Sequence, residues 1–145
     1  MFELGTDGPS VIVSGIDGSE SSMRAGAYAA GLARRQGSKL VLVYIAPIGG
    51  GVNAMAVAAT AQLGGETAAD LRRQISRAVQ RMPEAPAWEF IVESGDPFNG
   101  LVEVAVRLRA DAVVIGASQS TGHRIIGSVA VRLVKAGRWP VTVVP

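Results

Sequence analysis

Five short apolar runs constrain the fold of this chain more than any other feature of its sequence. They cover residues 11–16, 40–45, 88–92, 112–115 and 141–144, and stretches with helical spacing separate them. A strand that is apolar along its whole length is buried on both faces, as in a parallel sheet covered by helices on both sides. The alternation of such strands with helices therefore predicts an α/β fold, with a parallel sheet between two layers of helices.

The segments between the apolar runs carry helix signals. An alanine-rich helix is expected after residues 17–19 and up to about residue 35, and a helix over residues 66–82 has apolar residues at i, i+4 and i+8. Asp96 and Pro97 form a strong helix start, because aspartate caps the first N–H groups and proline fits the first helical position. A fourth helix is expected over residues 128–136.

Residues 46–65 form a long stretch without a charged side chain. The stretch contains too many glycine, alanine and polar residues to be apolar enough for a transmembrane helix. We expect it to be a mobile connection with a short alanine-rich helix over residues 53–63.

The composition is that of one compact domain, residues 1–145, in which 48% of the residues are hydrophobic and 18% are charged. A net charge of +2 and the lack of an aromatic platform argue against nucleic-acid binding. With no cysteine and one histidine, a metal site has almost no support. The first residues do not read as a signal peptide, so we expect a cytoplasmic protein without a membrane segment.

Two loops at the carboxyl ends of expected strands carry candidate binding chemistry. Residues 17–19 follow the first strand, and residues 116–128 follow the fourth and end in Gly127 and Ser128, where a helix begins. The unpaired N–H groups and the dipole of a helix start favour an anion. Ligands of open parallel sheets bind beyond the carboxyl ends of the strands. The sequence therefore predicts a phosphate-binding loop after the fourth strand.

The chain resembles the universal stress protein family at both ends. VIVSGIDGSESS (residues 11–22) is similar to the family's opening strand and turn, while IG (115–116), GSVA (127–130) and WPVTVV (139–144) are similar to its ending. The resemblance extends over the whole chain in length and element order. It implies a three-layer α/β/α open sandwich, with a five-stranded parallel Rossmann-like sheet of order 3-2-1-4-5. It also implies frequent homodimers and, in one subgroup, ATP binding.

The signature of the ATP-binding subgroup is a glycine, two residues, a second glycine, nine residues, and then Gly-Ser or Gly-Thr. Gly116 and the Gly-Ser pair at 127–128 match its two ends. Gln119 stands at the place of the second glycine, and seven residues separate it from the pair. Gly122 can serve instead with a different spacing, and Arg124 would supply positive charge for a phosphate.

The resemblance implies a nucleotide site built from three parts of the chain. Asp17 would contact the adenosine, the main chain of Leu40 or Val41 would hold the adenine edge, and the loop after the fourth strand would bind the phosphates. The implied site residues are Ile16, Asp17, Leu40, Val41, Ile115, Gly116, Gln119, Gly122, Arg124, Gly127, Ser128, Val129 and Ala130.

Two functions stay open at this point. The chain is either a stress-response homodimer that binds ATP, with Mg²⁺ entering only with the nucleotide, or a member that binds no ATP and acts as a dimeric interaction or scaffold protein. In both, residues 141–144 would be an edge strand whose unpaired main-chain groups pair with a second copy. No hydrolytic triad is evident, so we predict no catalytic residue and at most slow ATP hydrolysis.

Overall fold

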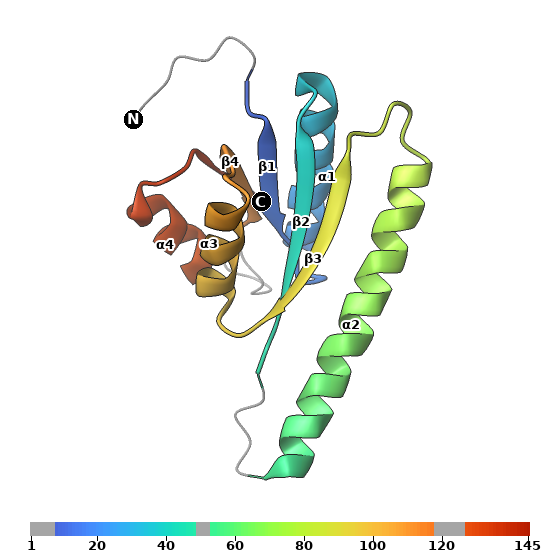
Figure 1. Cartoon of the computed structure of the whole chain (residues 1–145), viewed down its shortest axis with the longest axis vertical. Helices are drawn as coiled ribbons and strands as arrows, with labels where there is room; N and C mark the ends of the chain where they lie inside the picture. The colour runs from blue at the N-terminus through green and yellow to red at the C-terminus, as the bar shows by residue number, and fades with distance from the viewer. Residues whose placement is uncertain (1–7, 49–52, 118–126) are drawn as a thin grey trace.

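The computed structural model describes residues 8–48, 53–117 and 127–145. Five parallel strands form one sheet in the order β3-β2-β1-β4-β5, which confirms the predicted order and fold class (Figure 1). The strands are β1 (Val11–Gly15), β2 (Lys39–Ala46), β3 (Trp88–Ser94), β4 (Ala112–Gly116) and β5 (Val141–Val144). The helices are α1 (Glu20–Gln36), α2 (Ala54–Gln80), α3 (Pro97–Arg107) and α4 (Ser128–Ala136).

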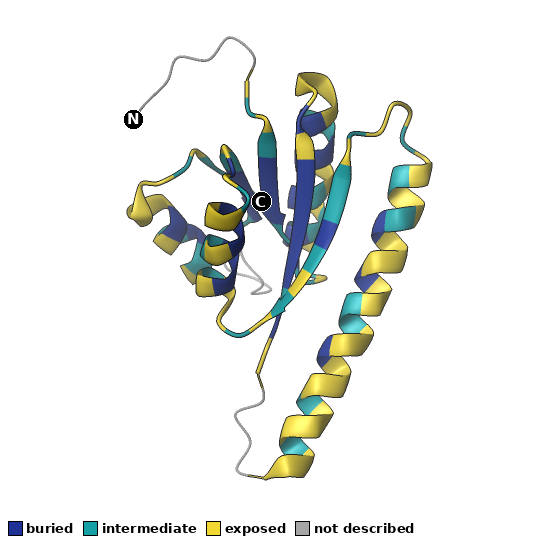
Figure 2. Ribbon diagram, viewed as in Figure 1, coloured by how far each residue is buried: buried dark blue, intermediate teal, exposed yellow. Residues whose placement is uncertain are grey.

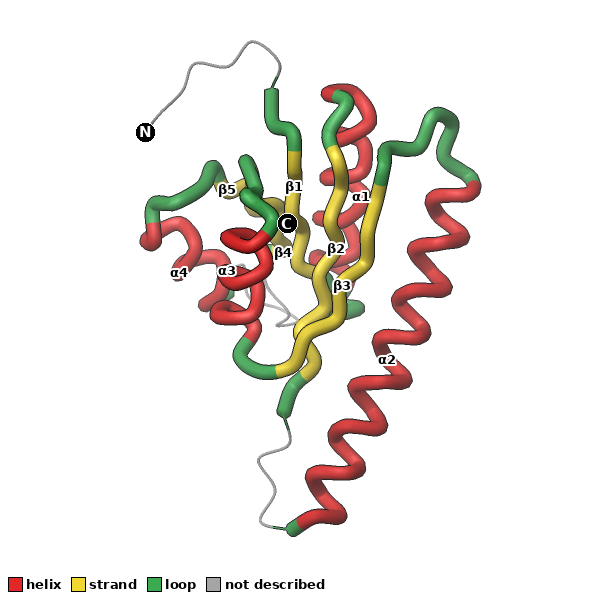
Figure 3. The backbone as a smooth tube through the Cα atoms, viewed as in Figure 1, coloured by secondary structure: helices red, strands yellow, loops and turns green. Residues whose placement is uncertain are grey.

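The sheet separates two hydrophobic cores. Successive side chains of β1 point to opposite faces, so Ile12 packs with α1 and α2 while Val13 packs with α3 and α4. Figure 2 shows the central strands buried along their length, and Figure 3 shows the helices on both sides of the sheet. The three-layer arrangement expected from the apolar strands is thus present.

The second helix corrects one prediction. A mobile connection with a short helix was expected before residue 66, but α2 is a single helix of 27 residues that begins after Asn53. The Asn53 side chain caps it by accepting a hydrogen bond from the N–H of Ala56 at 2.8 Å. Gly64 lies inside this helix at a point where the main chain passes close to β2: a Cβ on Gly64 would lie 3.2 Å from the Cβ of Ala46.

The two halves of α2 differ in burial. Leu71 and Ile75, on the predicted apolar stripe, are buried under the sheet. The first half is largely exposed, and the side chain of Met55 is 83% exposed (Figure 2). Across the residues that the structure describes, no helix is both long and apolar enough to span a bilayer.

The parallel topology brings three helix starts to one edge of the sheet. Helices α1, α3 and α4 follow β1, β3 and β4 in the chain, so each begins near the carboxyl end of a strand. Strands β1 and β4 are neighbours, paired from Ile12 with Ala112 to Ser14 with Val114. The turn at residues 17–19 and the described ends of the segment after β4, residues 116–117 and 127–128, therefore lie at the same edge, where the strand order reverses.

Candidate functional site

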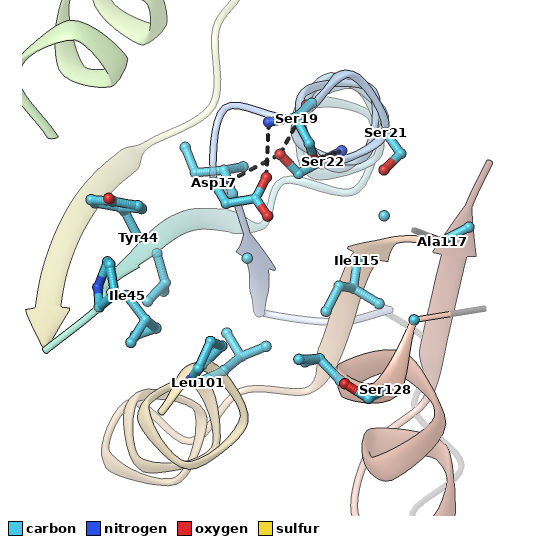
Figure 4. Close-up of a pocket in the computed structure, with 18 residues that line it drawn as sticks. Asp17, Ser19, Ser21, Ser22, Tyr44, Ile45, Leu101, Ile115, Ala117 and Ser128 are labelled. Atoms are coloured by element: carbon cyan, nitrogen blue, oxygen red, sulfur yellow. Dashed lines mark hydrogen bonds between the residues drawn. The ribbon is translucent and has the colours of Figure 1, made fainter. Parts of the chain in front are cut away.

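A cavity of about 630 Å³ lies at the carboxyl ends of β1, β2 and β4. This volume is within the range of pockets that hold small-molecule ligands. Figure 4 shows Asp17 and Ser22 on one side of the opening, with Leu101 of α3 and Ser128 of α4 on the opposite side. The cavity thus combines groups from the first and fourth βα units with the end of β2.

Asp17 is held in place by the turn between β1 and α1. Its carboxylate accepts a hydrogen bond from the N–H of Ser19 at 2.9 Å, and its own N–H donates to the hydroxyl of Ser22 at 3.1 Å. Ser19 caps α1 by accepting from the N–H of Ser22 at 3.3 Å. Asp17 thus acts as a turn residue, and these hydrogen bonds fix its carboxylate at the cavity wall.

The end of β2 offers main-chain groups to the cavity. The C=O of Val43 accepts a hydrogen bond from the N–H of Ile16 at 2.8 Å, on the β1 side of the strand. Alternate residues of a parallel strand face the same neighbour, so Ile45 directs its N–H and C=O to that side, past the end of β1. Ile45 lines the cavity. One donor and one acceptor are thus positioned together for a ligand.

The start of α4 is open to an anion. Gly127 is the N-cap residue and makes no side-chain capping hydrogen bond. Its N–H donates to the C=O of Ala117, which joins the end of β4 to the start of the helix. The N–H groups of the first turn then face outward without an acidic cap, and Ser128 and Val129 line the cavity.

The start of α3, on the same face of the sheet, is closed by its own side chains. The carboxylate of Asp96 accepts from the N–H of Asn99 at 2.9 Å, and Pro97 occupies the first helical position. Both features match the sequence prediction. Arg132 of α4 lies 3.7 Å from the Asp96 carboxylate and 3.9 Å from the ring centre of Phe98.

Gly116 is required by packing between β4 and α1. A Cβ at this position would lie 2.7 Å from the carbonyl carbon of Ser21 and 2.7 Å from the main-chain nitrogen of Ser22. Any other residue would push the first turn of α1 away from the sheet. Gly116 also lines the cavity, so the same glycine sets the distance between two of its walls.

The structure brings together only part of the predicted site. Ala130 is close to the cavity in the chain, but its side chain is 1% exposed and belongs to the core with α3. Gln119, Gly122 and Arg124 lie outside the described residues. The predicted residues that line the cavity are Ile16, Asp17, Ile115, Gly116, Gly127, Ser128 and Val129.

Leu40 and Val41 are two further predicted residues that do not line the cavity. Leu40 pairs with Ile12 and with Trp88 near the beginning of β2, at the end of the strand away from the cavity. Strand β2 continues to Ala46, and its residues that border the cavity are Val43, Tyr44 and Ile45, near the carboxyl end.

Several lining residues were missed in the sequence. Val43, Tyr44 and Ile45 at the end of β2, and Pro97 and Leu101 of α3, all border the cavity. The register of β2 against β1 would have identified the first three, but a run of apolar residues does not reveal where its neighbour ends. Leu101 lies on the buried, apolar face of its helix, and an apolar helix face does not by itself indicate a cavity.

Comparisons with known proteins identify relatives of the whole fold. The model of the universal stress protein family matches residues 10–145. A universal stress protein of Methanocaldococcus jannaschii is 29% identical over 137 residues, which cover 92% of this chain and 80% of that protein.

Two solved structures have the same fold. Universal stress protein UspA from Lactobacillus plantarum superposes with a TM-score of 0.82 at 20% identity, over 94% of this chain and 97% of that one. A universal stress protein family protein from Arabidopsis thaliana with AMP bound gives a TM-score of 0.67 at 18% identity, over 94% and 91%.

Proposed function

Because the chain belongs to the universal stress protein family, we propose that it binds an adenine nucleotide in the cavity at the carboxyl ends of β1, β2 and β4. The observation that carries this proposal is the convergence of three kinds of group on one cavity. These are the carboxylate of Asp17, the main-chain pair of Ile45 and the uncapped start of α4. The AMP bound to the Arabidopsis family protein supports the same ligand class.

The adenosine part fits the first two groups. The N–H and C=O of Ile45 match the acceptor and donor on the edge of adenine, and Leu101 and Ile115 supply an apolar surface for the base. The carboxylate of Asp17 can accept hydrogen bonds from the ribose hydroxyls. The adenine contact thus moves from Leu40 and Val41 to the end of the same strand.

The phosphate part fits the start of α4. The N–H groups of the first helical turn and the hydroxyl of Ser128 can donate to phosphate oxygens, and the helix dipole favours the negative charge. ATP, with Mg²⁺ carried by the nucleotide, is the ligand predicted from the sequence. We propose at most slow hydrolysis of that ATP.

Mass spectrometry of the denatured, purified protein tests this proposal by identifying any released nucleotide. Unfolding is then followed with and without AMP and Mg-ATP. A bound nucleotide raises the free energy of unfolding by about 2.7 kcal/mol when its free concentration is about 100 times Kd.

Two glycine variants, one as the test and one as its control, show whether the rise in the free energy of unfolding depends on the start of α4. Gly127→Val should abolish the rise, because its side chain covers the N–H groups of α4 while its backbone angles (φ −62°, ψ 156°) suit any residue. Gly31→Val should keep the rise, since a Cβ at Gly31 of α1 meets no atom within 4 Å. No released nucleotide and no rise at millimolar concentrations would favour the alternative, a dimeric interaction or scaffold protein.

We also propose that the chain forms a homodimer through β5. The C=O of Pro140 accepts a hydrogen bond from Val113 of β4, and the C=O of Val144 accepts one from Ala117, the residue after β4. Val141 and Val143 alternate with these acceptors, so they direct their main-chain groups to the free edge. Such an edge is a template for pairing with a second strand.

Light scattering at micromolar concentration tests the dimer. Val143→Pro removes one outward N–H of β5 without removing a β4 hydrogen bond and should shift the mass toward the monomer. Val92→Pro is the matched control: it removes an outward N–H from β3 at the opposite edge of the sheet and should leave the mass unchanged. A monomeric mass for the unmodified protein would rule out this interface.

A further inference from the structure

Gly100 is a buried glycine in the first half of α3, at a position whose backbone conformation does not require glycine. Helix α3 runs from Pro97 to Arg107, and the N–H of Gly100 donates to the C=O of Asp96 at 2.9 Å, as in a regular helical turn. Glycine is the weakest helix former apart from proline, so alanine here would favour the helix itself. The reason for this glycine therefore lies in what α3 packs against.

The side chain of Ile45 fills the space beside Gly100. A Cβ at Gly100 would lie 2.7 Å from Cδ1 of Ile45, 3.1 Å from its Cγ1 and 3.2 Å from its Cγ2. Carbon atoms in favourable contact are about 3.5–4.0 Å apart. The Cδ1 atom can turn away by rotation about χ2, but the two γ carbons are held by the stiff χ1 of a β-branched residue. A methyl group at residue 100 would therefore push α3 and the main chain of Ile45 apart.

Ile45 is also the residue whose main chain is proposed to contact the base. It pairs with Glu93 of β3 and lies two residues beyond Val43, the last residue of β2 that is paired with β1. Its side chain packs against the core under α3, and the residue lines the cavity. Figure 4 shows Ile45 at the end of β2, with Leu101 of α3 also at the cavity. A displacement of Ile45 away from Gly100 would therefore move a donor and an acceptor at the cavity wall.

We propose that Gly100 is a positioning residue for base recognition, because it lets α3 pack directly on Ile45 and so sets the place of that residue's N–H and C=O in the cavity. The inference rests on the proposed nucleotide binding. Adenine carries an amino donor at the position where hypoxanthine, the base of IMP, carries a carbonyl acceptor. A site built to pair with one edge rejects the other, because its own groups are left unpaired. The selectivity for AMP over IMP therefore reports on the position of the Ile45 main chain.

Isothermal titration calorimetry with AMP and IMP tests the inference. The unmodified protein should bind AMP at least about tenfold more tightly than IMP, because IMP leaves hydrogen-bonding groups unpaired. Gly100→Ala should lower this ratio of affinities by at least about threefold, since it displaces the main-chain pair of Ile45. A substitution that only lowers the folded fraction weakens the binding of both ligands equally and leaves the ratio unchanged.

Two further variants isolate the contact between residues 45 and 100. Gly31→Ala makes the same substitution in α1, where a Cβ meets no described atom within 4 Å, and it should leave the ratio unchanged. Ile45→Ala removes all three carbon atoms that a Cβ at Gly100 would approach. In the Ile45→Ala background, Gly100→Ala should lower the ratio by less than about 1.5-fold, because two residues in contact are coupled and the contact is gone.

The outcomes separate this inference from the proposed function. Equal affinities of the unmodified protein for AMP and IMP would overturn base recognition by Ile45 and leave nucleotide binding intact, a result that depends on the folding of no variant. An unchanged ratio in Gly100→Ala, or an equal fall in Gly31→Ala or in the Ile45→Ala background, would overturn the role of Gly100. If the unmodified protein bound neither ligand, nucleotide binding would be overturned, and the inference with it.

Discussion

The first turns of α3 and α4 both contain main-chain N–H groups without a partner inside the helix, and the two helices differ in how these groups are bonded. Both helices lie on one face of the sheet, and each anchors a buried leucine in the same core. The start of α3 is completed by the protein itself, through the Asp96 cap and Pro97. The start of α4 has a glycine cap that satisfies none of its N–H groups with a side chain. The difference teaches that the residue at the cap decides whether the first N–H groups of a helix are bonded by the protein's own side chain or left accessible.

The largest expected effect is a loss of stability when the buried leucine of either helix is truncated, and it shows whether α3 and α4 are equally anchored in the core. Leu101 of α3 and Leu133 of α4 are 2% and 0% exposed. Truncation of either, Leu101→Ala or Leu133→Ala, should lower the free energy of unfolding by about 2–5 kcal/mol, because each leaves a cavity in the core. Urea unfolding followed by circular dichroism measures this loss. The exposed Val134→Ala should change stability by less than about 0.5 kcal/mol. If either leucine variant lost less than about 1 kcal/mol in the free energy of unfolding, that leucine would not anchor its helix in the core as the comparison requires.

Gly127→Asp makes the start of α4 resemble that of α3. The new carboxylate can cap the helix and should raise the stability of the ligand-free protein by a few tenths of a kcal/mol. It should also remove the rise of about 2.7 kcal/mol expected at 100 times Kd of AMP, because it occupies the same N–H groups.

Thermal and urea unfolding with and without AMP measure both effects of Gly127→Asp. Gly127→Asn separates occupation of the N–H groups from charge, since it can cap the helix without repelling phosphate. An aspartate variant that still gains stability from AMP would show that the phosphate does not bind at α4.

The smallest expected effect is at α3. Asp96→Ala removes the hydrogen bond to the N–H of Asn99 and should cost about 1 kcal/mol of stability. The AMP-dependent rise in the free energy of unfolding should stay within about 0.5 kcal/mol of its original value, because Asp96 caps α3 and is not one of the proposed nucleotide contacts. Asp70→Ala, at an exposed aspartate of α2, is the control for stability and should cost less than about 0.5 kcal/mol. Loss of the AMP-dependent stabilisation in Asp96→Ala would show that the start of α3 also contributes to nucleotide binding.

Most of the fold was predictable from local pattern. The apolar runs located all five strands of the sheet, and the Asp-Pro pair located the start of α3 to the residue. Gly64 and Gly65 misled the prediction for α2, because a glycine can mark either a helix break or a close approach. Only the tertiary distance from Gly64 to Ala46 shows which of the two applies.

The site was less predictable than the fold. Asp17 and Gly127, which lie next to recognisable turns in the sequence, both line the cavity. The sequence prediction placed the main-chain contribution of β2 at Leu40 and Val41, whereas the part of β2 that borders the cavity is residues 43–45. Side-chain identity carries no information on where the neighbouring strand ends. The requirement for Gly116 also arises between segments about 95 residues apart in the sequence, where it packs against Ser21 and Ser22.

The hydrogen bond between the N–H of Gly127 and the C=O of Ala117 has a consequence for the engineering of this chain. It joins the residue after β4 directly to the N-cap of α4, so the start of α4 is tied to the sheet by a main-chain bond of its own. The entropic cost of closing a loop grows slowly with its length. We therefore expect α4 to keep its place beside β4 when the number of residues between Ala117 and Gly127 is changed, which would make the chain a starting point for grafting new ligand specificities.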